Sequence, residues 1–251
     1  MIYVLDFDGV LFDTASEVMA IGYATVKNID LDPTKVPEKF KDFFRINRSR
    51  SNDSAAMFIL SKFCVEELEK GKEPYIIDRE SFQNIYEAQK DNLKTLGDKI
   101  SKKRESLVKN FLEDWLKLNK PYKEIWEFVR DKDFYIVSHK DAASIKLLTS
   151  TFNKDIDDSK IFSRDQKGSK ADKILKIYEK EKQDIIFVDD AINNLIDIKR
   201  ELNSPLWLTQ YLAGWGYIGK EDNEILKSHS DIKFLKNEKE LIEIWKSRLS
   251  N

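Results

Sequence analysis

The stretch that decides the fold is Val4-Leu5-Asp6-Phe7-Asp8-Gly9-Val10-Leu11-Phe12-Asp13-Thr14. The apolar run Ile2–Leu5 predicts a buried strand, and two carboxylates follow it, one residue apart. Because successive side chains of a strand point to alternate faces, Asp6 and Asp8 are expected to share one direction. Gly9 then allows a sharp turn without a Cβ penalty. Open α/β sheets bind ligands at the carboxyl ends of their strands, so this acid pair predicts a functional site rather than a solvated loop.

The composition disfavours several classes of protein. The 251 residues are 41% hydrophobic and 35% charged, with a formal net charge of −2. This composition suffices for a core and gives no global attraction to nucleic acid or membrane. The single cysteine, Cys64, excludes an internal disulfide, and two histidines disfavour a histidine-built zinc site. No signal peptide and no uncharged run of about 18 residues is found. We expect a cytoplasmic protein without nucleic-acid or membrane partners, either a monomer or a weak homodimer.

Strand and helix patterns alternate at both ends of the chain, and a helical block without strand patterns separates them. The helices predicted in this block cover 15–30, a segment from Asp53 or Ser54 to the stop at Gly71, 79–96 with Gly97 beyond it, and 99–118. The sequence therefore predicts a helical domain at 15–119. Its hinges are expected near Asp13–Ala15 and Asn119–Pro121.

From about residue 122 the pattern changes to short apolar runs between helical segments. The predicted strands cover 134–137, 161–162, 184–188 and 205–209. The predicted helices cover 122–131, 141–152, 170–182 and 191–202. Such alternation is typical of βαβ units and a parallel sheet flanked by helices. We therefore predict an α/β core domain formed by residues 1–14 and 120–251.

Polar residues close two of these strands. The run Ser138-His139-Lys140 follows strand 134–137, and Asp189-Asp190 ends strand 184–188. A serine hydroxyl donates a hydrogen bond to an anion without adding charge, and carboxylates suit Mg²⁺. A helix cap at Ser138 and an exposed turn at 189–190 are the plainer interpretations of the same residues.

Two lysines lie at or just before the start of the predicted helix 170–182. Gly168-Ser169-Lys170 opens the predicted helix 170–182, and Lys170 best fits the spacing of the apolar positions of that helix. Lys167, in the loop before the helix, is the alternative. In a chain so rich in charge, either lysine is a surface residue by default.

These segments together resemble the motifs of the haloacid dehalogenase-like (HAD) hydrolases. Asp6-Phe7-Asp8-Gly9 resembles motif I, Ser138-His139-Lys140 resembles motif II, and Lys170 resembles the lysine of motif III. Asp189-Asp190 resembles the double-aspartate form of motif IV, with Asn193 and Asn194 following where a further acid often stands.

Later segments narrow the resemblance to the phosphoglycolate phosphatase-like branch. They are Ala213-Gly214-Trp215-Gly216-Tyr217, Ser230-Asp231 and Glu240-Leu241. The resemblance covers residues 1–14 and 120–251, and the block 15–119 lies where members of the family carry a helical C1 cap. It implies a HAD-like Rossmannoid core, a parallel sheet flanked by helices, with an inserted all-helical cap domain.

The resemblance also implies a chemistry, namely Mg²⁺-dependent phosphoryl transfer from a small phosphorylated substrate. Asp6 would be the nucleophile that becomes an aspartyl-phosphate, and Asp8 the general acid and base. The metal ligands it implies are Asp6, the Asp8 backbone carbonyl, Asp190 and, directly or through water, Asp189. The residues it implies at the phosphate are Ser138 and Lys170, with Gly9, His139 and Lys140 in the substrate-binding segments.

Alternatives to a phosphomonoester hydrolase remain open at this point. A phosphomutase or phosphonatase of the same superfamily would use the same motifs, and a catalytically weak binding or regulatory protein would keep only the fold. A 2-haloacid dehalogenase fits less well because the second aspartate of motif I is usually absent there. In the helical block, Arg45, Arg48 and Arg50 either meet a second anionic group or lie on a solvated loop, and Cys64 is expected to be buried and inert.

Overall fold

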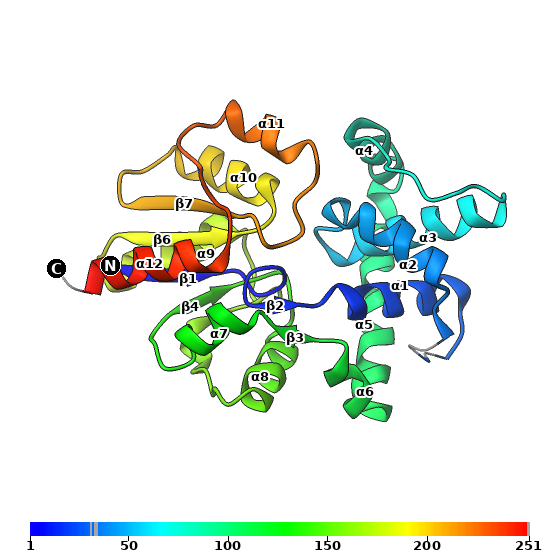
Figure 1. Ribbon diagram of the computed structural model, residues 1–251, viewed down its shortest axis with the longest axis horizontal. Coiled ribbons are helices and arrows are strands. Elements are labelled where there is room, and N and C mark those ends of the chain that lie inside the picture. Colours follow the sequence, from blue (N-terminus) through cyan, green and yellow to red (C-terminus); the bar gives the residue numbers. More distant parts are fainter. Residues whose placement is uncertain (31, 33–34, 250–251) are drawn as a thin grey trace. The chain divides into compact units, whose positions relative to one another are not determined.

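A computed structural model describes residues 1–30, 32 and 35–249 of the chain (Figure 1). The chain divides into two units, one formed by Met1–Asp13 and Pro121–Asn251 and the other by Thr14–Lys120. The expected boundaries were 1–14 with 120–251, and 15–119. Short strands β2 (Phe12–Asp13) and β3 (Lys120–Pro121) mark the two places where the chain passes between the units.

The first unit contains a parallel sheet with the order β5-β4-β1-β6-β7-β8. Its strands are β1 (Ile2–Leu5), β4 (Tyr135–Val137), β5 (Ile161–Phe162), β6 (Ile185–Asp189), β7 (Leu208–Ala213) and β8 (Lys233–Leu235). Every neighbouring pair in this order runs parallel, so the carboxyl ends of all six strands lie along one edge. The α/β fold class predicted from the alternating pattern is confirmed.

Helices cover both faces of the sheet. They are α7 (Lys123–Val129), α8 (Ala142–Thr151), α9 (Lys170–Glu181), α10 (Ile192–Leu202), α11 (Asp222–Lys227) and α12 (Glu238–Leu249), with the 3₁₀ helix η4 (Asp158–Lys160). Val4 of β1 packs in one cluster with Ile174 of α9 and Leu195 of α10. The adjacent Tyr3 stacks on Trp245 of α12, with ring centroids 3.6 Å apart. Because neighbouring strand residues face opposite sides, these contacts place helices on both faces.

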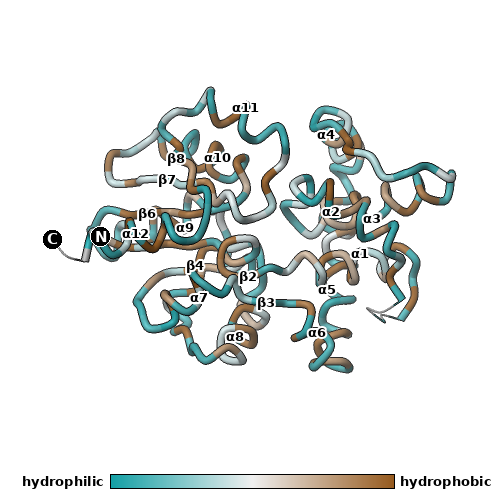
Figure 2. The backbone as a smooth tube through the Cα atoms, in the orientation of Figure 1, coloured by the Kyte–Doolittle hydropathy of each residue, from teal (hydrophilic) through white to brown (hydrophobic). Residues whose placement is uncertain are grey.

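The central strands carry the apolar core, as the hydropathy colouring of β4 and β6 illustrates (Figure 2). All residues of β6 are buried, and it lies between β1 and β7. One predicted strand is displaced, because β7 covers 208–213 instead of 205–209. The apolar pattern misled here: Leu206 is fully exposed, whereas the polar Gln210 is buried and donates from Nε2 to the Leu195 carbonyl at 2.9 Å.

The second unit is helical. Its elements are α1 (Ala15–Lys27), α2 (Glu38–Ile46), η2 (Arg48–Arg50), α3 (Ser54–Glu69), α4 (Arg79–Glu87), η3 (Lys90–Asn92), α5 (Leu93–Asn110) and α6 (Leu112–Lys117). Helix α3 begins as expected after Asp53, whose side chain caps the Ala56 N–H at 2.8 Å. Within the described residues of this unit, no helix is both long and apolar enough to cross a membrane, and the same holds for the first unit.

Several helix boundaries in this unit differ from the sequence prediction, and the predicted helix 99–118 is divided at Phe111 between α5 and α6. The predicted helix 79–96 ends at Glu87, and α5 continues through Gly97 where a break was expected. A Cβ on Gly97 would lie 3.6 Å from Ser54 Cβ, an ordinary contact, so this glycine lies where α5 packs on α3. A glycine inside a helix costs only about 1 kcal/mol relative to alanine, which the packing of α5 offsets. The prediction also omitted α2, which follows Pro37 and buries Phe40, Phe43 and Phe44.

Candidate active site

Asp6 lies at the carboxyl end of β1 and is almost fully buried. Its N–H donates to the Val188 carbonyl at 2.9 Å, which continues the pairing of β1 with β6. Its Oδ1 accepts the Phe7 N–H at 2.7 Å, and its Oδ2 accepts Lys170 Nζ at 2.7 Å. A hydrogen bond with the Ser138 side chain also favours the ionised form of the carboxyl. Asp6 is therefore held in one orientation from several sides.

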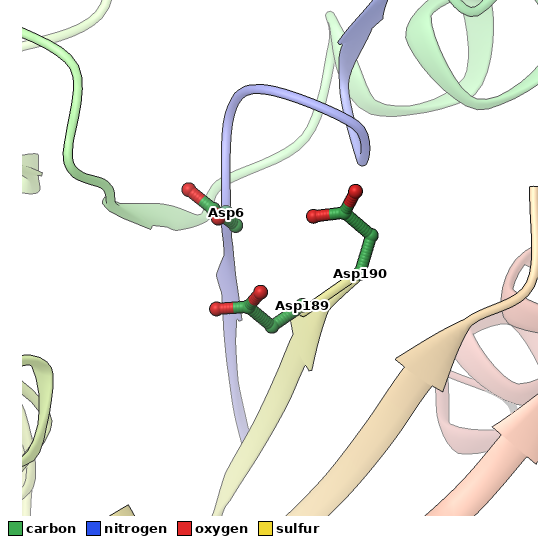
Figure 3. Close-up of side chains that lie close together, drawn as sticks. All are labelled: Asp6, Asp189 and Asp190. Carbon is green, nitrogen blue, oxygen red and sulfur yellow. The ribbon is translucent and has the colours of Figure 1, made fainter. Parts of the chain in front are cut away.

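Asp189 and Asp190 end β6, the strand next to β1 (Figure 3). Leu5 pairs with Val188, so Asp6 and Asp189 follow the two strands side by side. Asp189 is fully buried, and its carboxylate accepts hydrogen bonds from Lys170 Nζ at 2.6 Å, from the Ala191 N–H at 2.8 Å, and from Asn194 Nδ2 at 3.0 and 3.2 Å. Both oxygens of Asp189 are thus engaged by the protein itself.

Asp190 packs against two glycines. Its Oδ2 accepts the Tyr217 N–H at 2.7 Å. A Cβ on Gly9 would lie 2.1 Å from that oxygen, and Gly9 has a φ of +81°, so only glycine fits there without strain. A Cβ on Gly216 would lie 2.3 Å from Asp190 Cβ. The close approach of two backbone segments to one carboxylate fixes its position.

The carboxylates of Asp6, Asp189 and Asp190 offer oxygens that all lie within 4.8 Å of one another. Burial raises the pKa of Asp6; Lys170 opposes that rise, and Asp189 adds to it. Burial alone would lower the pKa of Lys170, but the carboxylates of Asp189 and Asp6 outweigh it and raise that pKa. The Lys170 ammonium thus contacts two of the three buried carboxyl groups, and a second positive charge would stabilise their ionised forms.

Lys170 reaches the acids from the first turn of α9. Ser169 caps that helix, accepting the Asp172 N–H at 3.1 Å, while the Asp172 side chain accepts the Ser169 N–H at 2.9 Å. This capping box fixes where the helix begins and therefore where Lys170 starts. The alternative, Lys167, lies exposed in the preceding loop. The structure brings Lys170 to the acids.

The segment after β4 supplies a second ion pair. Ser138 is buried and its Oγ accepts the Lys140 N–H at 3.2 Å. Lys140 is also buried, and its Nζ donates to Asp8 Oδ1 at 3.1 Å. The side chain of Asp8 is 25% exposed, more than that of Asp6. Lys140 was expected to contact substrate; here it contacts Asp8. His139, between the two buried residues, is exposed.

The segment after β7 was not expected to reach the acids. Gly216 and Tyr217 were quoted only as family resemblance, yet they contact Asp190 as described above. The contact with Tyr217 uses a backbone N–H, which every residue but proline carries, so no side-chain pattern marks it. The two glycines of Gly214-Trp215-Gly216 were the available signal, since glycine often marks a close backbone approach.

The arginines singled out in the helical unit have structural partners. Arg45 pairs with Asp42 on α2 at 3.0 Å and is exposed. Arg48 Nη1 donates to the Ser51 carbonyl at 2.6 Å. Arg50 is buried and donates from Nη2 to the Ile77 carbonyl at 3.2 Å. A uniformly solvated loop was therefore the wrong expectation for Arg50. Cys64 is buried as expected, and burial raises the pKa of its thiol.

Comparison with known proteins places the fold. No family model matches the sequence, and no curated protein matches it. Among solved structures, the predicted phosphoglycolate phosphatase of Haemophilus somnus 129pt is 12% identical with a TM-score of 0.57, covering 97% of this chain and 96% of that one. A predicted phosphatase from Clostridium acetobutylicum is 17% identical with a TM-score of 0.53, covering 100% and 99%.

A haloacid dehalogenase-like family hydrolase from Streptococcus pneumoniae is similar over the same length. It is 13% identical with a TM-score of 0.56 and covers 97% of each chain. At such identities the likeness concerns the fold, and it extends through both units of the chain. The motifs at Asp6, Lys170 and Asp189-Asp190 predicted the same architecture. The chain therefore shares the fold of these predicted phosphatases and of this haloacid dehalogenase-like family hydrolase, an α/β core with an inserted helical domain.

Proposed function

We propose that the protein is a Mg²⁺-dependent phosphomonoester hydrolase that acts through an aspartyl-phosphate on Asp6. The observation that carries this proposal is the buried group of Asp6, Asp189 and Asp190, in which Lys170 contacts Asp6 and Asp189. Buried acids are rare unless they are paired or bind a cation, and here the acids outnumber the lysine. Proteins with the same fold include predicted phosphatases and a hydrolase, which supports the same reaction class.

The donor set fits a magnesium ion. Mg²⁺ prefers hard oxygen ligands, typically one or two carboxylates together with water and substrate phosphate. We assign Asp6 and Asp190, with the Asp8 backbone carbonyl, as the direct ligands. We assign Asp189 mainly to holding Lys170, because both of its oxygens already accept hydrogen bonds from the protein. When bound, the metal would offset the repulsion between the Asp6 carboxylate and the anionic phosphate.

Asp6 then performs the first half of the reaction. One carboxylate oxygen attacks phosphorus, and the bond from phosphorus to the leaving oxygen breaks. Lys170, at 2.7 Å from Asp6, and Ser138 are positioned to donate to the phosphate oxygens as charge develops on them. Lys170 stays charged because both neighbouring carboxylates raise its pKa. The carboxylate nucleophile is thus oriented before substrate arrives.

Asp8 handles the protons of both steps. Its carboxyl proton passes to the leaving oxygen in the first step. In the second step the Asp8 carboxylate takes a proton from water as that water attacks phosphorus, and the bond from phosphorus to Asp6 breaks to release inorganic phosphate. Lys140, 3.1 Å from Asp8, holds the carboxylate in place between the two steps. The partly exposed side chain of Asp8 is accessible to water, which the second step consumes.

The substrate we propose is a small phosphorylated metabolite. Phosphoglycolate belongs in the first panel of compounds because a protein with the same fold is described as a predicted phosphatase of it. Sugar phosphates and nucleotides complete the panel. We propose that the helical unit, Thr14–Lys120, selects among them, because the residues assigned to the reaction all lie in the α/β unit.

The test is turnover of p-nitrophenyl phosphate by wild type, Asp6→Asn and the control Asp197→Asn. Asp197 lies on α10 in the same unit and pairs with Arg200 in an exposed ion pair. We expect Asp6→Asn to lose at least about 10³-fold in kcat, and Asp197→Asn to match wild type. Activity should vanish in EDTA, return with Mg²⁺ and be inhibited by Ca²⁺, whose longer bonds and higher ligand number disturb the attack geometry.

Acid quenching during turnover should trap a phosphorylated wild-type protein, with the label on Asp6. Wild-type turnover by Asp6→Asn would contradict the nucleophile, and full activity after rigorous chelation would contradict the metal. Label that returns to substrate without release of inorganic phosphate would indicate a phosphomutase. Binding of phosphate without any turnover would indicate a binding protein on the same fold.

A further inference from the structure

The loop that follows β7 contacts two functionally distinct places with one residue. The N–H of Tyr217 donates to Asp190 Oδ2 at 2.7 Å. The hydroxyl of the same tyrosine donates to Asp13 Oδ1 at 2.8 Å. Asp190 is a ligand in the metal site proposed above, and Asp13 is the last residue of the α/β unit before the chain enters the helical unit. Tyr217 therefore connects the proposed metal site to Asp13, where the chain leaves the α/β unit.

Neighbouring residues fix this loop to the same segment. Trp215 Nε1 donates to the Val10 carbonyl at 3.1 Å. Gly216 leaves no room for a side chain, because its Cβ would lie 2.3 Å from Asp190 Cβ and 2.5 Å from the Gly9 carbonyl oxygen. The loop thus contacts the segment 9–13 at three successive residues while it holds Asp190.

Residues 7–12, which directly precede Asp13, form several backbone hydrogen bonds with one another. Asp8 forms a bridge with Phe12, and the Gly9 N–H donates to the Phe12 carbonyl at 2.8 Å. The N–H groups of Leu11 and Phe12 both donate to the Phe7 carbonyl at 3.0 Å. These bonds join Phe12, the residue before Asp13, to Gly9 and to Asp8.

We propose that Tyr217 is a positioning residue that couples the Asp190 carboxylate to Asp13, so that a divalent cation at Asp190 orders the connection into the helical unit. The inference rests on the proposed function for the presence of the metal. It adds a connection from the metal site to Asp13. A cation bound by the Asp190 carboxylate would restrain the Tyr217 backbone, whose N–H donates to that carboxylate. The Tyr217 hydroxyl would transmit this restraint to Asp13. Coupling of this kind is reciprocal, so ordering at Asp13 also strengthens cation binding.

The test is amide hydrogen exchange of the full-length protein with and without Mg²⁺, read at residues 10–14. In wild type we expect Mg²⁺ to slow exchange there by about fivefold, the lower end of typical coupling. Tyr217→Phe removes the hydroxyl and keeps the backbone N–H to Asp190. It should still bind Mg²⁺, with a Kd weakened by no more than that same factor of about five, yet show no Mg²⁺-dependent protection at 10–14.

Two further variants separate coupling from a merely structural role. Tyr211→Phe is the matched control, because the Tyr211 hydroxyl on β7 has no hydrogen-bond partner among the described residues; it should respond to Mg²⁺ as wild type does. Asp13→Ala should reproduce Tyr217→Phe, and the double variant should add nothing to either. Gly216→Ala should instead weaken Mg²⁺ binding itself, by about tenfold or more, since its Cβ displaces Asp190.

The outcomes distinguish this inference from the proposed function. If wild type binds no Mg²⁺ in a calorimetric titration, the metal role fails and the coupling fails with it. If wild type binds Mg²⁺ but exchange at 10–14 does not change, the coupling alone is overturned. Protection in Tyr217→Phe equal to that in wild type overturns it as well. Loss of protection in Tyr217→Phe with retained Mg²⁺ binding supports it.

Discussion

The two units each bury a cluster of charged side chains, and the clusters differ in their balance. In the helical unit, Glu17 of α1 is fully buried; its Oε1 accepts Arg104 Nε at 2.6 Å and Trp115 Nε1 at 3.1 Å. One carboxylate there meets one guanidinium and one neutral donor. In the α/β unit, Lys170 meets two of three clustered carboxylates.

This difference separates a structural cluster from a candidate site. The pair of Glu17 and Arg104 joins α1 to α5, and Trp115 adds α6, so its charges are satisfied within the fold. The cluster at Asp6 leaves negative charge in excess where solvent is excluded, which costs stability unless a cation is bound. We therefore expect changes in the first cluster to alter folding, and changes in the second to alter metal binding and catalysis.

The largest effect is expected from Lys170→Met, which leaves Asp6 and Asp189 without their shared ammonium. Phosphatase activity should fall by at least about 10³-fold, because the group proposed to orient the nucleophile and to bind phosphate is lost. Lys167→Met, the exposed neighbour, is the control and should keep wild-type kcat. Equal losses in the two variants, measured with p-nitrophenyl phosphate, would show that the lysine was assigned wrongly.

The balanced cluster should respond in stability instead. Glu17→Gln leaves the buried Arg104 charge without its carboxylate and should lower the free energy of unfolding by about 3 to 5 kcal/mol. The exposed pair of Lys27 and Glu69 is the control, and Glu69→Gln should cost about 1 kcal/mol or less. Urea denaturation measures both. If folded Glu17→Gln also lost kcat, the cluster at Glu17 would not be purely structural, and this result would contradict the comparison of the two clusters.

A third cluster, on the helical unit, gives the smallest effect and a defined pH dependence. Glu67 accepts hydrogen bonds from Lys72 at 2.5 Å, Tyr75 at 2.6 Å and Lys70 at 2.9 Å, and these lower its pKa from 4.5 to about 2. Because the folded pKa lies below the unfolded one, the contribution is complete above about pH 4.5 and is lost as the pH falls toward 2.

The measurement is the difference in unfolding free energy between wild type and Glu67→Gln as a function of pH. We expect a constant advantage of wild type at neutral pH that shrinks below pH 4.5. A difference that stays constant down to pH 3 would mean that the ion pairs do not perturb the carboxyl in solution.

Much of this architecture could be predicted from local patterns. The apolar runs before Asp6 and Asp189 predicted two strands, and the structure pairs them as parallel neighbours, which brings their carboxyl ends together. The predicted start of the helix at Lys170 agrees with α9, which begins there after the capping box of Ser169 and Asp172. These predictions succeeded because each depends on residues close in sequence.

Other features depend on packing between distant segments and left a weaker signal. In the sequence, Gly97 indicates the end of a helix, whereas in the structure it lies inside α5, where that helix packs against α3. In the sequence, the polar Gln210 indicates the end of a strand, whereas in the structure its side chain donates to the Leu195 carbonyl and the strand continues. The Tyr217 N–H on Asp190 is a backbone contact over 27 residues, which side-chain patterns do not encode. The helix α2 could have been predicted from the sequence, because Phe40, Phe43 and Phe44 have helical spacing.

The central claim is that the buried carboxylates of Asp6, Asp189 and Asp190 bind a divalent cation. Its most direct test is the unfolding free energy of metal-free protein with added Mg²⁺, for wild type and Asp190→Asn. At Mg²⁺ about a hundredfold above its Kd, wild type should gain about 2.7 kcal/mol. Asp190→Asn should gain none and, without metal, should be at least as stable as wild type. Equal stabilisation of the two proteins, or none of wild type, would contradict the claim.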